Sequence, residues 1–212
     1  MAGRSNQSRL GPRFQEALWY AVTLHRGQYR KGTRIPYISH LLAVTGIVLE
    51  HGADEDVAIA ALLHDAVEDR GGRETLRRIR RRFGLRVAEI VEQCSDTLNV
   101  RKPPWRRRKQ AYLAHLLAAS DEARLISLSD KLHNARMIVQ DLRREGERVW
   151  RRFGGGEDGT LWYYRSLVDV FRRSSAPADL VQELARLVSR MHTLAGRSRH
   201  QHLAHRGGSR AD

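Results

Sequence analysis

The chain has 212 residues, which is enough for one well-formed hydrophobic core with at most a small appendage. Hydrophobic residues make up 41% of it, and no apolar run approaches the roughly 18 residues of a membrane helix, so we expect no contact with a membrane. The net charge of +14 is almost entirely arginine and is spread along the chain without interleaved aromatic residues, which makes a nucleic-acid partner unlikely.

Apolar residues recur at helical spacing over most of the chain, and no segment shows the alternation that is typical of a strand. A first helix is predicted at about 12–26, followed by a loop at 27–39 that is rich in Gly, Pro and Arg. The next helix is predicted at about 40–51, and Asp54 is a plausible N-cap for a helix that runs through Glu68. Further helices are predicted at about 73–83, 85–95, 105–119, 121–145, 160–173 and 178–195.

The sequence shows neither an internal repeat nor a boundary between two domains. We therefore predict an all-α protein, a single helical bundle of about eight to ten helices over residues 12–195. Residues 1–11 are expected to form a flexible N-terminus. Residues 196–212 contain few apolar side chains, so we expect them to form a disordered basic tail.

Cysteine usage and the N-terminal residues both bear on the compartment. Cys94 is the single cysteine, so no internal disulfide can form, which is typical of a reducing compartment. The first 13 residues carry positive charge, but they are not followed by the apolar stretch of a secretory signal. We therefore expect a cytoplasmic protein. Nothing in the sequence indicates an oligomeric state.

Histidine and aspartate residues interrupt three otherwise apolar helices. His40 begins the helix at 40–51, His64 and Asp65 follow the run Ala-Ala-Leu-Leu, and Asp130 follows another apolar stretch. Charged side chains are rarely buried unless they are paired or bind a metal ion. Two imidazoles and two carboxylates suit a borderline or hard divalent cation, such as Mn²⁺, Fe²⁺ or Mg²⁺. We therefore predict that His40, His64, Asp65 and Asp130 bind one divalent cation.

Two further carboxylates, Glu68 and Asp69, follow the His–Asp pair on the same predicted helix. At about 3.6 residues per turn, Glu68 shares a face with His64, and Asp69 shares one with Asp65. A purely structural metal site closes its coordination sphere and needs no spare carboxylates beside it. The pair therefore indicates catalysis, with Glu68 as a candidate general base and Asp69 beside it.

Three motifs carry a resemblance to a known family. The chain contains PYISH around His40, ALLHDAVED around His64 and SLSDKLHNAR around Asp130. In this combination it resembles the HD phosphohydrolase superfamily and, more narrowly, the hydrolase domain of RelA/SpoT-type enzymes and the small alarmone hydrolases. The resemblance extends over about residues 14–195. It implies an HD-domain fold and an Mn²⁺-dependent enzyme that removes the 3′-pyrophosphate of ppGpp or pppGpp, giving GDP or GTP and pyrophosphate.

The resemblance also implies roles for individual residues. It makes His40, His64, Asp65 and Asp130 ligands of a single metal ion, typically Mn²⁺, and makes Glu68 and Asp69 the pair that orients and deprotonates the attacking water. Asn134 matches an asparagine that helps to hold the sugar end of the nucleotide, and Arg30 and Lys31 match basic residues that hold the base or the phosphates. Many long enzymes of the family have a Gly-Glu pair where this chain has Arg34 and Ile35.

Other residues are weaker candidates for substrate binding. Arg34 would add to the positive charge of Arg30 and Lys31, and Tyr163 and Tyr164 could stack on a base, although paired aromatic residues are more often part of a core. Two alternatives to ppGpp hydrolysis stay open. One is an HD phosphohydrolase acting on another phosphorylated nucleotide, such as an adenine alarmone or NADPH. The other is a non-catalytic, basic helical protein that binds nucleic acid.

Overall fold

The computed structural model describes residues 10–97 and 103–207, with side chains described as far as residue 196. Residues 1–9 of the expected N-terminus and residues 208–212 of the expected tail lie outside the described part. In the described part the protein is all-α, as predicted, with ten α-helices and one 3-10 helix. It contains no β-strand there, only an isolated antiparallel bridge between Tyr29 and Pro36.

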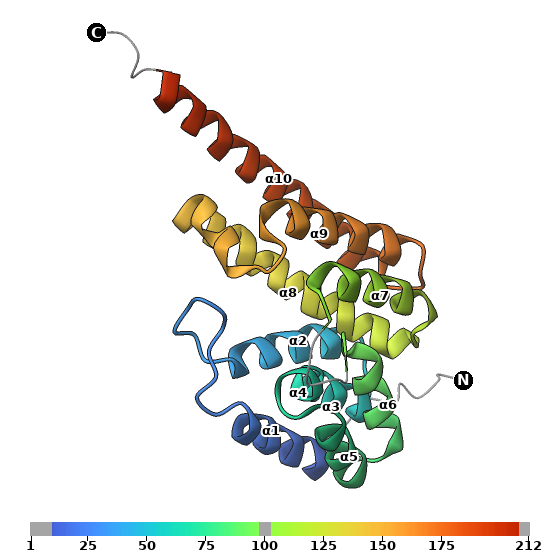
Figure 1. Cartoon of the computed structure of the whole chain (residues 1–212). Helices are drawn as coiled ribbons and strands as arrows, with labels where there is room; N and C mark the ends of the chain where they lie inside the picture. Colours follow the sequence, from blue (N-terminus) through green and yellow to red (C-terminus); the bar gives the residue numbers. More distant parts are fainter. Residues whose placement is uncertain (1–9, 98–102, 208–212) are drawn as a thin grey trace. The chain divides into compact units, whose positions relative to one another are not determined.

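The helices follow one another in the order shown in Figure 1. They are α1 (Pro12–Leu24), α2 (Ile38–Glu50), α3 (Glu55–Leu63), α4 (Ala66–Asp69), α5 (Gly72–Phe83), α6 (Leu85–Cys94), α7 (Trp105–Ala118), α8 (Asp121–Glu145), the 3-10 helix η1 (Gly146–Arg152), α9 (Gly156–Arg172) and α10 (Ala178–Gly207).

The chain divides into two compact units, the first ending at Asp130 and the second beginning at Lys131. The sequence shows no such boundary because the division falls inside α8, where the helix continues without a linker. None of the described helices is long and apolar enough to cross a membrane.

Helix α3 is the centre of the first unit. All residues from Val57 to Leu63 are buried, and the helix packs against α1, α2 and α6 (Figure 1). A helix that is apolar on every side belongs in the interior of a protein. Its N-cap is as predicted, because the side chain of Asp54 accepts a hydrogen bond of 3.1 Å from the backbone N–H of Val57. The end of this central helix positions the candidate site.

The predicted continuous helix over 54–68 is wrong. Helix α3 ends at Leu63, His64 and Asp65 form a turn, and α4 then adds four residues. Within this turn His64 Nδ1 donates a hydrogen bond of 2.8 Å to the carbonyl of Ala61, a local side-chain contact that competes with regular helix bonding. No glycine or proline marks the break in the sequence.

Three other boundaries differ from the predicted ones. Residues 146–152 form η1, and α9 begins at Gly156 rather than at 160. Helix α10 continues to Gly207, so residues 196–207 are helical where we expected a disordered tail. No proline interrupts these residues, and one internal glycine costs a helix only about 1 kcal/mol.

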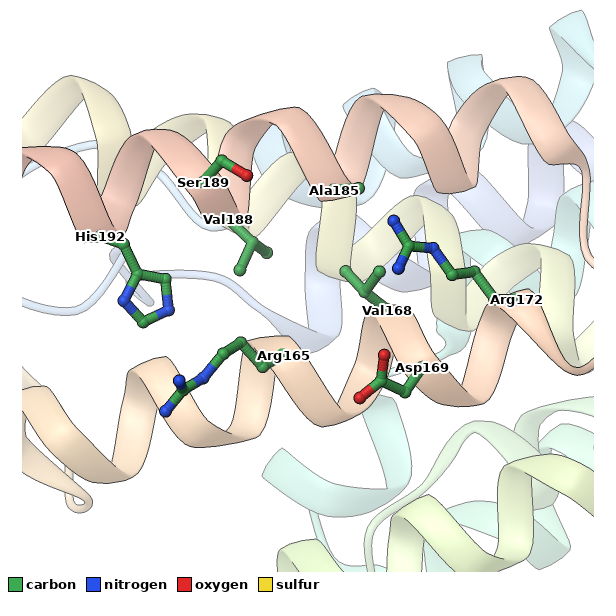
Figure 2. Close-up of a pocket in the computed structure, with 8 residues that line it drawn as sticks. All are labelled: Arg165, Val168, Asp169, Arg172, Ala185, Val188, Ser189 and His192. Atoms are coloured by element: carbon green, nitrogen blue, oxygen red, sulfur yellow. The ribbon is translucent and has the colours of Figure 1, made fainter.

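In the second unit, α9 and α10 pack against each other and against η1. Between α9 and α10 lies a surface groove with a volume of about 290 Å³ (Figure 2). Figure 2 shows the side chains that line it, which are Arg165, Val168, Asp169, Arg172, Ala185, Val188, Ser189 and His192. None of the predicted site residues lines this groove.

Candidate metal centre

The first unit brings the four predicted metal ligands together. The ligand atoms of His40, His64 and Asp65 all lie within 4.8 Å of one another. Oδ1 of Asp130, on α8, lies 3.1 Å from Nε2 of His40 and 3.9 Å from Nε2 of His64. The cluster therefore draws on α2, on the turn after α3 and on α8, three segments that are far apart in the sequence.

The cluster is buried on most sides. The side chains of His40 and His64 are 1% and 3% exposed, that of Asp130 is 7% exposed and that of Asp65 is 22% exposed. Two carboxylates in such surroundings would cost much free energy unless positive charge compensated them. Asp65 is the most accessible member, so the cluster is open to solvent on its side.

The break between α3 and α4 explains how two consecutive residues serve one centre. Neighbouring side chains on a regular α-helix do not face each other. In the turn between the helices, Nε2 of His64 lies 3.1 Å from Oδ2 of Asp65. Both side chains can therefore point to the same position.

The protonation of His64 suits a metal ligand. A carbonyl oxygen can only accept, so Nδ1 of His64 donates to Ala61, and in the neutral ring Nε2 then carries the lone pair. This buried Nε2 forms no well-aligned hydrogen bond within the described residues, although Asp65 is close. Neutral imidazole nitrogens and carboxylates are the donors that a divalent transition-metal ion accepts. The residues present therefore fit the cation.

Electrostatics in the cluster also favours a bound positive charge. Burial lowers the pKa of His64, but the carboxylates of Asp65 and Asp130 outweigh burial and raise that pKa well above its ordinary value. Burial likewise raises the pKa of Asp65, but His64 and His40 outweigh it and hold that pKa well below its ordinary value. The carboxylate of Asp65 thus stays ionised, and a cation would take the place of the proton on the imidazole of His64.

Tyr37 is a site residue that the sequence analysis missed. Its hydroxyl donates a hydrogen bond of 2.5 Å to Oδ2 of Asp65. Burial and the nearby carboxylates raise the pKa of Tyr37, so the hydroxyl keeps its proton and remains a donor. The ring stacks on that of His25, with centroids 5.2 Å apart, and meets His40 edge-on at 5.6 Å. The sequence signal that could have identified Tyr37 was its position three residues before His40.

Replacing Tyr37 by phenylalanine is expected to weaken metal binding. Phe keeps the ring packing but removes the hydrogen bond that orients Asp65, and such outer contacts typically contribute about 10–100-fold to metal affinity. Calorimetric titration with Mn²⁺ measures the change. Tyr29→Phe is the matched control, because Tyr29 lies on the same loop and is 55% exposed. Equal affinity in Tyr37→Phe and wild type would show that Asp65 does not depend on this hydrogen bond.

Glu68 and Asp69 both lie on α4, directly after the cluster. Asp69 N–H donates to the carbonyl of Asp65 at 3.0 Å, so these two residues keep their helical spacing. His64 and Glu68 do not share a regular helix, because the break lies between them. The two carboxylates have partners from distant segments, since Nε2 of Gln28 donates to Asp69 at 2.8 Å and Nη1 of Arg108 donates to Glu68 at 3.3 Å. Sequence analysis identified neither partner.

The predicted basic residues before His40 lie on the loop between α1 and α2. The backbone N–H of Arg30 donates to the carbonyl of Ile35 at 2.8 Å, and the turn between them includes Gly32, whose φ is +74°. Lys31 and Arg34 are exposed, and Arg30 is half-buried. The loop thus presents its positive charges at the surface of the first unit. Their contact with substrate stays a prediction.

The remaining predicted substrate contacts belong to the second unit. Asn134 lies on the second-unit part of α8, and Tyr163 and Tyr164 lie on α9. Both tyrosine side chains are buried, 5% exposed, and their rings meet edge-on with centroids 5.9 Å apart. This burial matches the role in the core that the sequence left open for them. Their contact with a nucleotide stays a prediction, as does that of Asn134.

The all-α fold brings an adjacent His–Asp pair together with a second His and a second Asp, which is the donor set of a candidate divalent-metal centre. The HD domain family matches residues 17–161, and the chain belongs to this family. The family implies a divalent metal ion at this centre.

Two relatives that share one enzyme name are similar to most of this chain. The chain is 38% identical over 138 residues to a guanosine-3′,5′-bis(diphosphate) 3′-pyrophosphohydrolase of Xenopus tropicalis, covering 64% of this chain and 72% of the relative. It is 32% identical over 171 residues to the enzyme of the same name from Drosophila melanogaster, covering 79% and 89%. A solved metazoan orthologue of SpoT, described as hydrolysing ppGpp, superposes with a TM-score of 0.67 and 30% identity, covering 84% of this chain and 94% of that one. The resemblance to RelA/SpoT-type hydrolases is confirmed.

Proposed function

We propose that this protein is a metal-dependent hydrolase that removes the 3′-pyrophosphate of ppGpp or pppGpp, giving GDP or GTP and pyrophosphate. The observation that carries the proposal is the cluster of His40, His64, Asp65 and Asp130 immediately before a pair of further carboxylates. Relatives that cover most of the chain are named for this reaction. A metal site that served structure alone would not require Glu68 and Asp69 beside it.

Four residues would hold the metal ion, which we propose to be Mn²⁺. His40 and His64 would bind it through Nε2, and Asp65 and Asp130 through carboxylate oxygens. A donor set of imidazole and carboxylate suits Mn²⁺ and also Fe²⁺ or Mg²⁺. When bound, such an ion lowers the pKa of a coordinated water and neutralises charge on a phosphate oxygen.

We propose that Glu68 is the general base and that Asp69 orients the attacking water. Glu68 accepts a proton as the water oxygen forms a bond to the phosphorus on the ribose 3′ oxygen. The bond between that phosphorus and the 3′ oxygen breaks, pyrophosphate leaves, and the 3′ oxygen takes up a proton. The hydrogen bond from Gln28 fixes the carboxylate of Asp69 for this task.

The substrate carries several negative charges, and we propose that the loop before His40 binds them. Arg30, Lys31 and Arg34 supply positive charge there, and arginine can contact a phosphate through two parallel hydrogen bonds. Asn134 would contact the sugar. The reaction would take place in the cytoplasm, in keeping with the single cysteine, Cys94.

A second candidate is the same reaction class on another nucleotide, such as an adenine alarmone or NADPH. It is favoured by Arg34 and Ile35, which are exposed on the loop that we propose to bind substrate and which replace the Gly-Glu pair of many long enzymes. A change of charge on a binding loop alters which substrate is preferred more readily than it alters the reaction.

A panel of phosphorylated nucleotides tests the proposed function. We expect ppGpp to be hydrolysed in the presence of Mn²⁺, with release of pyrophosphate rather than orthophosphate, and no hydrolysis after removal of the metal. Adenine alarmones and NADPH are included as competitors, and the two phosphate products are measured separately. Turnover of NADPH or an adenine alarmone with ppGpp left intact would overturn the proposed substrate but keep the reaction class. No turnover of any nucleotide would overturn the proposal.

A further inference from the structure

Helix α4 carries the proposed base, yet it has only four residues. The turn at His64 and Asp65 precedes it, and Gly71 and Gly72, with φ values of +105° and +57°, follow it closely. An isolated helical turn is not stable through its own backbone hydrogen bonds. The position of the Glu68 carboxylate must therefore depend on contacts made by side chains.

The contact to Glu68 comes from α7, a helix forty residues further along the chain. Nη1 of Arg108 lies 3.3 Å from Oε1 of Glu68 and 2.5 Å from Oδ2 of Asp96. Lys109 forms a second ion pair with the same oxygen of Asp96. The Arg108 side chain is 13% exposed and that of Asp96 is 3% exposed, so this is an interior network.

The arrangement fixes Arg108 independently of Glu68. Asp96 is nearly inaccessible, and Arg108 and Lys109 both compensate its charge, so the ion pair with Asp96 holds the same Nη1 that contacts Glu68. Interior ion pairs are screened less than surface pairs, and a guanidinium donates in a fixed planar geometry. A rigid donor of this kind restricts the carboxylate that it contacts to few orientations.

We propose that Arg108 is a positioning residue for Glu68 and that Asp96 anchors Arg108. The inference deepens the proposed function, on which it rests. Arg108 holds one oxygen of Glu68, so that α4 presents the carboxylate in one orientation during proton transfer. We therefore expect Arg108 to affect turnover and not metal binding, because Arg108 is not among the residues of the cluster.

The test is a double-mutant cycle with Arg108→Ala and Glu68→Gln in the full-length protein loaded with Mn²⁺. In the wild-type background we expect Arg108→Ala to lower kcat by about 10–100-fold, the usual effect of removing a contact that orients a reacting group. KM for ppGpp and Mn²⁺ affinity by calorimetry are expected to stay within about twofold of wild type. Once Glu68 can no longer act as a base, the second substitution is expected to change kcat by less than about threefold.

Arg107→Ala is the matched control, because Arg107 is the exposed neighbour on α7 and loses the same charge. It is expected to leave kcat unchanged. Arg108→Lys, which keeps a cation beside Asp96 but not the planar fork, is expected to recover part of the loss. It also takes the place of Arg108→Ala in the cycle if the alanine variant melts much earlier than wild type.

Three outcomes would overturn the inference. They are a kcat for Arg108→Ala close to that of wild type, a loss carried by KM or by Mn²⁺ affinity, and an equal loss in the presence and absence of Glu68. Failure of the proposed function has a different signature, since wild-type protein itself would then leave ppGpp intact. In that case there is no ppGpp hydrolysis for Arg108 to support, and the inference about Arg108 is rejected as well.

Discussion

Replacing His64 by alanine is expected to remove the bound metal ion and ppGpp hydrolysis together. His64 is 3% exposed, and the hydrogen bond from its Nδ1 to Ala61 leaves Nε2 as the atom that faces Asp65 and Asp130. Without it, two carboxylates and one imidazole remain in an interior site. Asp65→Ala is expected to have the same result, because it removes one of the two negative charges that attract the cation.

Metal content and turnover of the same preparations measure this effect. Elemental analysis should give little metal in either variant, and activity should be lost in proportion. His115→Ala, at an exposed histidine on α7, is the control that should keep both. Chelation of wild-type protein should also lower the melting temperature, because only the folded chain gains the free energy of metal binding. Full metal occupancy in His64→Ala would mean that His64 is not a ligand.

The residues of the candidate metal cluster could be picked out from the sequence because they violate a strong rule. Imidazole and carboxylate groups within apolar helices are rare unless a partner compensates them, so His64, Asp65 and Asp130 are conspicuous without any structural information. The helices could be predicted for a related reason, since apolar residues repeat at helical spacing. Their starts agree best where a local signal exists, as at Pro12 and at the Asp54 cap.

The turn at His64 could not be predicted, because no residue type in the sequence marks it. The local sequence is apolar and free of glycine and proline, so it favours a continuous helix. The break instead accompanies the approach of His40 and Asp130 from two other helices. Local preference is a weak signal when distant contacts oppose it.

The hydrogen-bond partners of the site residues could not be predicted from the sequence either. Gln28 contacts Asp69 across 41 residues, and Arg108 contacts Glu68 across 40. A chain with 38 basic residues offers many equivalent candidates for such a contact. Only the fold selects Arg108, by placing α7 where its guanidinium can reach Asp96 and Glu68 together.

Replacing Glu68 by glutamine is expected to separate catalysis from metal binding. Glutamine has nearly the same size and helix propensity as glutamate, and its amide oxygen can still accept the hydrogen bond from Arg108. It cannot take up the proton of the attacking water. We therefore expect unchanged Mn²⁺ content and melting temperature, with ppGpp hydrolysis slowed by roughly 10²–10⁴-fold, the usual contribution of general base catalysis.

The measurement is single-turnover hydrolysis of ppGpp at saturating Mn²⁺, so that neither metal binding nor product release limits the rate. Glu89→Gln is the matched control, because Glu89 is exposed on α6 and the substitution is chemically the same. A rate for Glu68→Gln within a few-fold of wild type would reject Glu68 as the base. Asp69 would then be the candidate, since it lies on the same short helix and Gln28 already orients its carboxylate.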